Sequence, residues 1–157
     1  ERTGSVSYAV VSENKDAATI GVGNVFSATA VGEYTIRATK AETDYYAEAT
    51  ADFTVTVGMR ANTLAISDTE FERFVDEEVT NVRSAQNSNA QVKTSSTAPT
   101  VAYYDVDQNK IVIPNNGTSE EQNFGYQKTV TIKIWQDATD RFEASGEKTI
   151  TLTVKKY

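Results

Sequence analysis

The chain has 157 residues, room for one or two domains, and a formal net charge of −7. An acidic surface repels phosphate backbones, which excludes nucleic acid as a natural partner, and no apolar run approaches the roughly 20 residues of a membrane-spanning helix. Cysteine and histidine are both absent, so the chain lacks disulfides, thiolate nucleophiles, the commonest general base and the commonest transition-metal ligand.

The chain begins with short strand patterns. Val6–Val10 alternates apolar and small side chains, which is typical of a strand with one buried face. Ala18–Ile20 and Val25–Ser27 are expected to be short strands joined by a hairpin. The turn between them is predicted to use Gly23 and Asn24, because both residues tolerate a positive φ.

The stretch from Tyr34 to Val57 occurs again, in altered form, from Val130 to Val154. The matched segments are Thr35-Ile36-Arg37 with Thr131-Ile132-Lys133, Thr43-Asp44 with Thr139-Asp140, and Phe53–Val57 with Ile150–Val154. Self-similarity at a fixed spacing is the sequence mark of a repeated unit. The sequence therefore predicts two domains of one kind, 1–58 and 59–157. Their short linker, Gly58–Asn62, is expected to allow limited swing.

The second unit contains strand patterns over most of its length. The expected strands are Leu64–Ile66, Gln91–Thr94, Lys110–Pro114, Gln127–Trp135 and Thr149–Lys155. Phe71–Val75 fits either an edge strand or a helical turn. Ala85–Ala90 is polar and is expected to be a mobile loop, and Asn115–Gln122 a surface loop. Many short strands with no convincing helix indicate an all-β protein made of antiparallel sandwiches.

These motifs resemble those of tandem bacterial immunoglobulin-like (Big) repeats. In the first unit the resemblance rests on Gly32–Thr39, on the bend Tyr46–Ala49 and on Phe53–Val57, and in the second on Thr129–Lys133 and Ile150–Val154. It implies two tandem immunoglobulin-like (Ig-like) antiparallel β-sandwiches from a bacterial surface or secreted protein. Such repeats are spacers or adhesive modules without a family-wide catalytic residue. The implied partners are other domains of the same surface protein, a glycan, or a host or cell-surface protein.

The first unit departs from the family pattern at its beginning. It lacks the opening strands that Leu64–Val82 supplies in the second unit, and an Ig-like sandwich without them exposes apolar faces and a free edge. Three explanations stay open. Glu1 marks a cut or disordered boundary, which we favour, or the unit is a smaller variant, or a partner strand completes it.

Trp135 is the most interesting candidate for ligand binding. It follows Ile134 in the alternation of its strand, so its ring is expected to point away from the core that Val130 and Ile132 fill. An outward Trp can stack on sugar rings or anchor a partner. The favoured interpretation is nevertheless that a bulge near Gln136 turns the ring inward, or that the ring packs against the other unit.

The tyrosine pairs Tyr45-Tyr46 and Tyr103-Tyr104 share this ambiguity. In each pair one ring is expected in the core and the other at the surface. Tyr45 and Tyr103 join Trp135 as candidate ligand-binding residues. A carbohydrate-binding module built on Trp135 and a neighbouring tyrosine is therefore the alternative to the spacer.

Asp105, Asp107 and Asn109 match the start of a calcium-binding EF-hand loop. The sixth position, however, is Lys110 where the loop needs Gly, and the twelfth is Asn116 where it needs Glu. The flanking residues have strand character. The favoured interpretation is a hairpin turn, with a weak surface calcium site as the alternative.

Five carboxylates lie close together between Glu70 and Glu78. A carboxylate pair supports glycosidase chemistry when burial keeps one member protonated. Here the neighbours are charged and polar residues that imply no apolar pocket, so a solvated acidic edge is favoured. No Gly-rich phosphate loop leads from a strand into a helix. The sequence thus indicates no enzyme and no cofactor.

Overall fold

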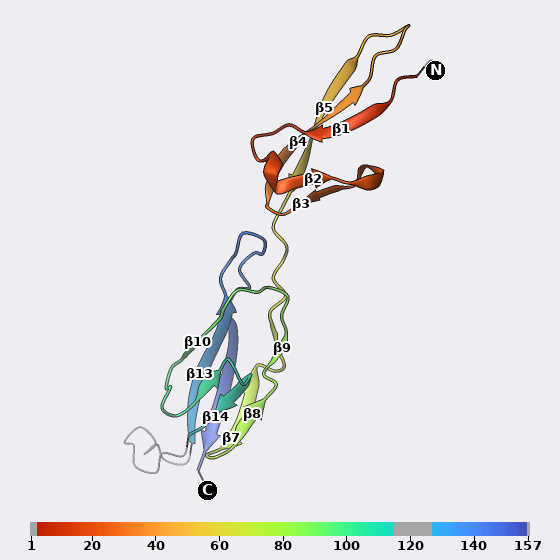
Figure 1. Ribbon diagram of the computed structural model, residues 1–157. Helices are drawn as coiled ribbons and strands as arrows, with labels where there is room; N and C mark the ends of the chain where they lie inside the picture. Colours follow the sequence, from red (N-terminus) through yellow and green to blue (C-terminus); the bar gives the residue numbers. More distant parts are fainter. Residues whose placement is uncertain (1–2, 115–126, 157) are drawn as a thin grey trace. The chain divides into compact units, whose positions relative to one another are not determined.

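The computed structural model describes residues 3–114 and 127–156 and divides the chain into two compact units, Glu1–Arg60 and Ala61–Tyr157. We name them unit 1 and unit 2. Regular structure in the described residues is β-sheet, apart from two single-turn 3-10 helices, η1 (Lys15–Ala17) and η2 (Val22–Asn24) (Figure 1). The predicted all-β fold class is confirmed.

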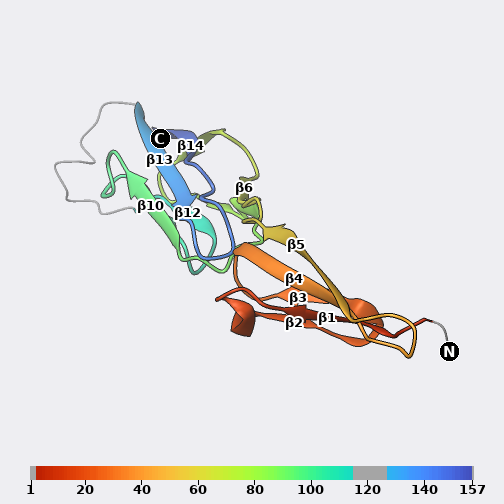
Figure 2. The same ribbon diagram turned by 90° about the horizontal axis from the view of Figure 1, so that it is seen from above.

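Unit 1 consists of a three-stranded antiparallel sheet and a two-stranded hairpin, and Figure 2 shows its strands side by side. Its strands are β1 (Val6–Val10), β2 (Ala18–Ile20), β3 (Phe26–Ala28), β4 (Gly32–Lys40) and β5 (Ala49–Val57). The sheet has the order β1-β4-β5, and β2 pairs with β3. Gly23 and Asn24 in the β2–β3 turn have φ values of 75° and 62°, as the sequence predicted.

Unit 2 has more strands and closes into two layers. They are β6 (Ala65–Ile66), β7 (Glu70–Phe74), β8 (Glu78–Thr80), β9 (Arg83–Ala85), β10 (Val92–Ser96), β11 (Tyr103–Asp105), β12 (Lys110–Val112), β13 (Gln127–Gln136) and β14 (Lys148–Lys155). One layer is the sheet β10-β13-β14-β7. The other combines the sheets β11-β12-β8 and β6-β9, which are joined because β8 leads directly into β9.

This distribution of strands is that of an Ig-like sandwich. An Ig-like sandwich has seven main strands. In unit 2 the first is β6, the second is β8 together with β9, the fourth is β11 and the fifth is β12. These strands all lie in one layer. The third, sixth and seventh strands, β10, β13 and β14, form the other layer. Ig domains divide their strands in the same way. The opening segment continues as β7, which crosses to the second layer and pairs parallel with β14.

The core of unit 2 lies between its two layers. Alternate residues of the central strands are fully buried: Val130, Ile132, Ile134, Ile150, Leu152 and Val154. The facing layer contributes Val79, Val82 and Ile111. Each such side chain stabilises the fold by about 1.5–3 kcal/mol through its removal from water.

The sheet of unit 1 has the same order and register as its counterpart in unit 2. Strands β1-β4-β5 are arranged as β10-β13-β14. Ile36 pairs with Phe53 as Ile132 pairs with Ile150. In both sheets a residue just after the first strand donates its backbone N–H to the matching threonine: Val11 to Thr35 O at 2.9 Å, and Thr97 to Thr131 O at 3.0 Å.

The loops after β4 and β13 also share one local geometry. Thr43 N–H donates to Tyr46 O at 2.8 Å, and Thr139 N–H donates to Phe142 O at 2.9 Å. The hydroxyl oxygen of each threonine accepts a hydrogen bond from the same aromatic residue, at 3.2 and 3.0 Å. Threonine suits this role because its side chain can satisfy turn amides.

Two expectations for unit 2 are settled by the structure. Phe71–Val75, which the pattern left undecided, contributes to strand β7. The polar stretch Ala85–Ala90, expected to be a mobile loop, is tied down: Ser88 is buried, and Asn87 bridges Thr63 N and Ala61 O. The expected loop Asn115–Gln122 lies outside the described residues.

Candidate functional site

Trp135 lies on the outer face of the sheet β10-β13-β14-β7. Its neighbours Ile134 and Gln136 are buried and Trp135 itself is half-buried, so the alternation of β13 continues through it. No register shift interrupts the pairing of Trp135 with Lys93 on β10. The ring therefore points outward as the alternation predicts, and the bulge near Gln136 that would turn it inward is absent from the described strand β13.

The residues two positions before and after Trp135, Lys133 and Asp137, each form an ion pair. Lys93 Nζ contacts Asp137, and Lys133 Nζ contacts Glu147 Oε2 at 2.6 Å. The indole is thus a half-covered apolar surface next to charged groups, an arrangement that suits stacking on a sugar ring or a peptide side chain.

The candidate tyrosines do not join Trp135. Tyr104 is buried and Tyr103 is exposed, as expected for neighbours in a strand, so Tyr103 points outward from β11. Because β11 and β13 belong to opposite layers of the sandwich, Tyr103 and Trp135 lie on opposite outer faces of unit 2. Tyr45 belongs to unit 1. The structure brings no two of these three rings together on one sheet face.

For Tyr45-Tyr46 the expectation of one buried ring is wrong. Both rings are exposed, because the pair lies in the loop between β4 and β5. Side chains alternate between two faces only where the backbone is extended and paired.

Asp105, Asp107 and Asn109 lie at the turn between β11 and β12, in agreement with the hairpin interpretation. The oxygen Oδ1 of Asn109 accepts from Arg83 N at 2.7 Å and from the Tyr104 hydroxyl at 2.8 Å. Its Nδ2 donates to Arg83 O at 3.0 Å. Asn109 therefore fastens the hairpin to β9, and burial raises the pKa of its partner Tyr104.

The acidic segment near β7 is engaged in local contacts. Glu72 pairs with Lys155 and Glu78 with Lys110, each at 2.6 Å. Glu77 Oε2 accepts from Phe74 N at 2.8 Å. The hydrogen bond that Lys110 donates to the Glu78 carboxylate raises the pKa of Lys110. In residues 3–114 and 127–156, no three acidic side chains form a group that could hold a metal ion.

Sequence reasoning missed one buried polar residue at the end of the core. Gln136 is fully buried, and its Nε2 donates to the carbonyl oxygens of Ser88 and Ala90 at 3.3 and 2.5 Å. Its backbone N–H donates to Ser145 Oγ at 2.8 Å. The signal was available, because the alternation Val130, Ile132, Ile134 points Gln136 inward, but a glutamine there was not assigned to the core.

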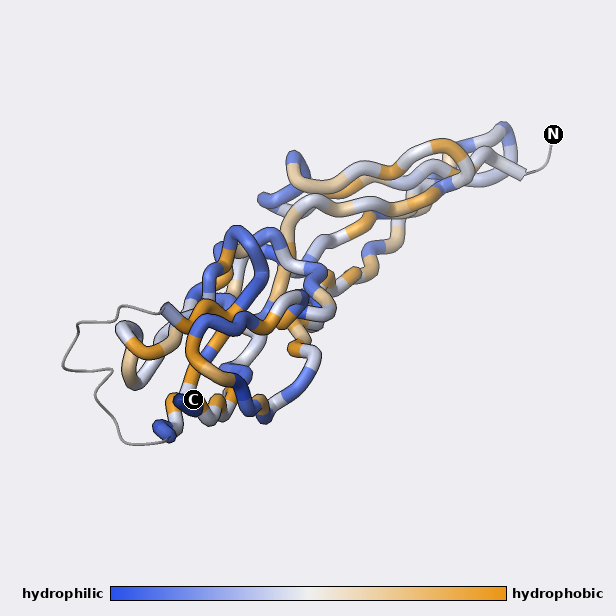
Figure 3. The backbone as a smooth tube through the Cα atoms, turned by 90° about the horizontal axis from the view of Figure 1, so that it is seen from below, coloured by the Kyte–Doolittle hydropathy of each residue, from blue (hydrophilic) through white to orange (hydrophobic). Residues whose placement is uncertain are grey.

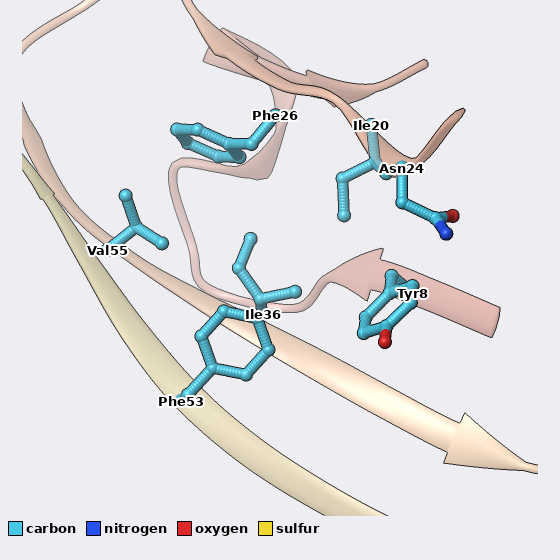
Figure 4. A pocket seen from close by; sticks show the side chains of 7 residues that line it. All are labelled: Tyr8, Ile20, Asn24, Phe26, Ile36, Phe53 and Val55. Carbon is cyan, nitrogen blue, oxygen red and sulfur yellow. The ribbon is translucent and has the colours of Figure 1, made fainter. Parts of the chain in front are cut away.

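A further unassigned surface is the open inner face of unit 1, between its sheet and the β2–β3 hairpin. A cavity of about 260 Å³ lies there (Figure 4). Its apolar lining is Tyr8, Ile20, Phe26, Ile36, Phe53 and Val55, and Asn24 adds an amide at one side. Phe26 meets Tyr34 edge-on, with ring centroids 5.5 Å apart. The lining comes from both layers of unit 1.

The apolar residues of unit 1 stay largely in contact with solvent. Among its described residues, Tyr34 and Ile36 are the buried large side chains, whereas Val6 and Phe53 are 52% and 47% exposed. Figure 3 shows hydrophobic stretches along the strands of both units. Apolar strands that stay exposed mark an interaction surface.

Comparison with known proteins finds similarity of fold only. No protein-family pattern and no curated protein matches the chain. The solved structure of Drosophila N-cadherin EC1-4 is 12% identical, with a TM-score of 0.42 over 98% of this chain and 41% of that one. Domains 4 and 5 of the S-layer protein SbsC are 14% identical, with a TM-score of 0.45 over 94% and 70%. Mouse protocadherin PcdhgC3 EC1-3 is 10% identical, with a TM-score of 0.46 over 99% and 56%.

In the part of the chain that the structure describes, no helix has the length and hydrophobicity needed to cross a bilayer.

Proposed function

We propose that this chain is a non-catalytic, Ig-like structural and adhesive module of a bacterial cell-surface or secreted protein. In this proposal its two units are copies of one β-fold, with the domains 1–58 and 59–157 expected from the sequence. It holds other regions of the same protein apart and offers protein or glycan contacts. The bacterial origin rests on the resemblance to Big repeats.

The observation that supports a mechanical role is the parallel pair β7–β14 of unit 2. Glu70–Phe74 runs alongside Thr151–Lys155 in the same direction. The chain therefore enters unit 2 at one end of the sandwich and leaves it at the other. A pulling force along the strands loads the hydrogen bonds between them together, in shear, instead of breaking them one by one.

Several contacts strengthen this pair. Thr151 N–H donates to Thr69 O at 2.8 Å, and Val75 N–H donates to Lys155 O at 2.9 Å. The ion pair between Lys155 and Glu72 spans the same two strands. A spacer needs this arrangement at the point where tension enters the fold.

Stretching the full chain from its two ends, one molecule at a time, tests the proposal. Unit 2 is recognised by its greater contour length, and we expect it to unfold at higher force than unit 1. Val75→Pro removes the N–H that bonds Lys155 and should lower that force. Val75→Ala, the matched control, keeps the N–H and should lower the force less. Unit 2 events no stronger than those of unit 1 would contradict the mechanical role.

Glycan binding by Trp135 is the second candidate, because its ring is half-exposed on an outer sheet face. A glycan array probed with the full chain and with Trp135→Ala tests it, with Tyr103→Ala as the control on the opposite face. Signals that are lost only with Trp135→Ala support binding. If no glycan on the array gives a signal, glycan binding by Trp135 is rejected and the spacer role alone remains.

A further inference from the structure

The outer face of the sheet β10-β13-β14-β7 places charged groups beside one aromatic ring. Lys93 lies directly opposite Trp135 in the register of β10 and β13, and its ammonium group contacts Asp137. Lys133 lies two residues before Trp135, on the same face of β13, and its ammonium nitrogen is 2.6 Å from Glu147 Oε2. Two ammonium groups and two carboxylates therefore lie near the indole, and their formal charges cancel.

These four charged side chains stay in contact with water. Each of them is between 43% and 57% exposed. Exposed ion pairs contribute little to the stability of a fold. A ligand can therefore form hydrogen bonds with these groups at little cost to the stability of unit 2.

A sugar ring matches both parts of this surface. The face of a pyranose presents C–H groups that pack on an aromatic ring, and its hydroxyls lie around the edge. A carboxylate accepts hydrogen bonds from two adjacent hydroxyls, and an ammonium group donates to hydroxyl or ring oxygens. The charge on the protein group strengthens such bonds. Trp135 supplies the apolar platform for this ligand, and the paired ions supply the polar rim.

The balance of charge selects the kind of sugar. A carboxylate on the sugar approaches a lysine that already has a carboxylate partner, and the two carboxylates repel each other. An amino group on the sugar meets the two lysines in the same way. A charged sugar must therefore break an ion pair and leave one charge without its partner, whereas a neutral sugar leaves both pairs intact.

A protein partner fits this surface less well. The centre of a protein interface is depleted of charged residues, and its anchor side chains lie where water is excluded. At Trp135 the ring is half-buried beside two exposed ion pairs. The outward residues of β14 nearby, Thr149 and Thr151, are exposed and add hydroxyl groups, which suit a glycan.

We infer that Trp135, with the ion pairs Lys93–Asp137 and Lys133–Glu147, binds a neutral pyranose of a glycan and discriminates against sugars that carry a charge. The inference rests on the glycan-binding candidate of the proposed function and names the class of its ligand. The site recognises the absence of charge on the sugar ring, not one particular arrangement of its hydroxyls.

Titration of the full chain with three matched probes tests this at a pH of about 6. The probes are methyl β-D-glucopyranoside, which is neutral, the matching glucuronide, which is anionic, and the matching glucosaminide, which is cationic. Trp135 is the only tryptophan of the chain, so its fluorescence reports on this ring alone. We expect a saturable change with the neutral glucoside, and a dissociation constant at least about threefold below those of both charged probes.

Two charge variants should alter this preference. Asp137→Asn leaves Lys93 without its carboxylate partner, and we expect it to bind the glucuronide at least about threefold more tightly than the parent chain does. Lys93→Gln should do the same for the glucosaminide. Trp135→Ala, followed by the amide chemical shifts of β10 and β13, should lose binding of the neutral probe. Tyr103→Ala, on the opposite layer, is the matched control and should bind like the parent chain.

Three outcomes overturn the inference. Equal or tighter binding of a charged probe by the parent chain would reject the neutral ligand class and leave glycan binding by Trp135 standing. Unchanged preferences in Asp137→Asn and Lys93→Gln would show that the ion pairs do not set the specificity. No saturable change with any of the three probes would reject the sugar platform itself, while the spacer role, which is tested by force, would be unaffected.

Discussion

Unit 1 and unit 2 place strands of matching order and register in different surroundings. In unit 2, Ile150 and Leu152 face a second layer that carries Val79 and Val82, and they are completely buried. In unit 1, Phe53 occupies the place of Ile150 and remains half-exposed. The difference teaches that alternation within a strand sets which face is apolar, whereas burial depends on whether another element covers that face.

The largest expected contrast comes from truncating this matched pair. Ile150→Ala should lower the free energy of unfolding of unit 2 by about 2–5 kcal/mol, because it leaves a cavity in a closed core. Phe53→Ala should cost unit 1 about 1 kcal/mol or less, since half of the ring already contacts water. Denaturant unfolding of the full chain, monitored by amide signals in each unit, measures both. Equal costs would break the comparison.

Gln136 offers the next contrast. Gln136→Ala removes the donor to Ser88 and Ala90 and should destabilise unit 2 by about 1–3 kcal/mol. The matched residue of unit 1 is Lys40, which pairs with Val6 as Gln136 pairs with Val92. Because Lys40 is exposed, Lys40→Ala should change stability by less than about 0.5 kcal/mol. A comparable loss of stability in both variants would contradict the stabilising role assigned to the buried Gln136 amide.

Asn24 and Asn109 both lie in hairpin turns, and a comparison of their alanine variants separates the cost of backbone strain from the cost of lost side-chain hydrogen bonds. Asn24 and Asn109 have φ values of 62° and 51°, so alanine introduces similar strain at both positions. Asn109→Ala additionally removes the bonds to Arg83 and Tyr104 and should cost about 1–2 kcal/mol more than Asn24→Ala. Thermal unfolding of the two variants gives the difference. Equal costs would mean that the bonds to β9 contribute little.

The smallest effect concerns the exposed pair Arg37–Asp52, which joins β4 to β5 at 2.7 Å. The hydrogen bond from Arg37 lowers the pKa of Asp52 below its ordinary 3.8. A lowered pKa in the folded state adds stability above the unfolded pKa, and this is lost as the pH falls through the folded value. Asp52→Asn should therefore slightly weaken unit 1 at neutral pH and make no difference in strong acid.

Thermal melts of the parent and Asp52→Asn chains, taken from neutral to acidic pH, check this. Added salt should shrink the difference at neutral pH, because the pair is exposed. A difference that grows on acidification would have the wrong sign. In unit 2 the pair Lys133–Thr149 takes this place in the register, and the ion pair of Lys133 is instead with Glu147.

Strand positions could be predicted from the sequence wherever local pattern decides them. Alternation located Val6–Val10 and the strand expected at Gln127–Trp135, and turn chemistry identified Gly23 and Asn24. The parallel pairing of β7 could not be predicted, because a short segment near two phenylalanines fits a strand or a helical turn until β14 lies beside it. The burial of Ser88 likewise depends on Gln136, which is distant in sequence.

The candidate site shows the same limit. The outward direction of Trp135 follows from the period of its strand. The separation of Trp135 from Tyr103 follows from the assignment of β11 and β13 to opposite layers, which no local pattern encodes. The open face of unit 1 was expected from the absence of opening strands, but its lining residues depend on how the β2–β3 hairpin lies over the sheet.

Residue-resolved hydrogen exchange at one matched pair of amides tests the central comparison most directly. Thr151 N–H is bonded at 2.8 Å to the carbonyl oxygen of Thr69, the residue just before β7. Thr54 holds the same place in the register of β5, at the edge with no neighbouring strand in the described part of unit 1. We predict that Thr151 exchanges only with global unfolding of unit 2, and that Thr54 exchanges at close to the rate of an unprotected amide. Strong protection of Thr54 in the monomeric chain would contradict an open first unit.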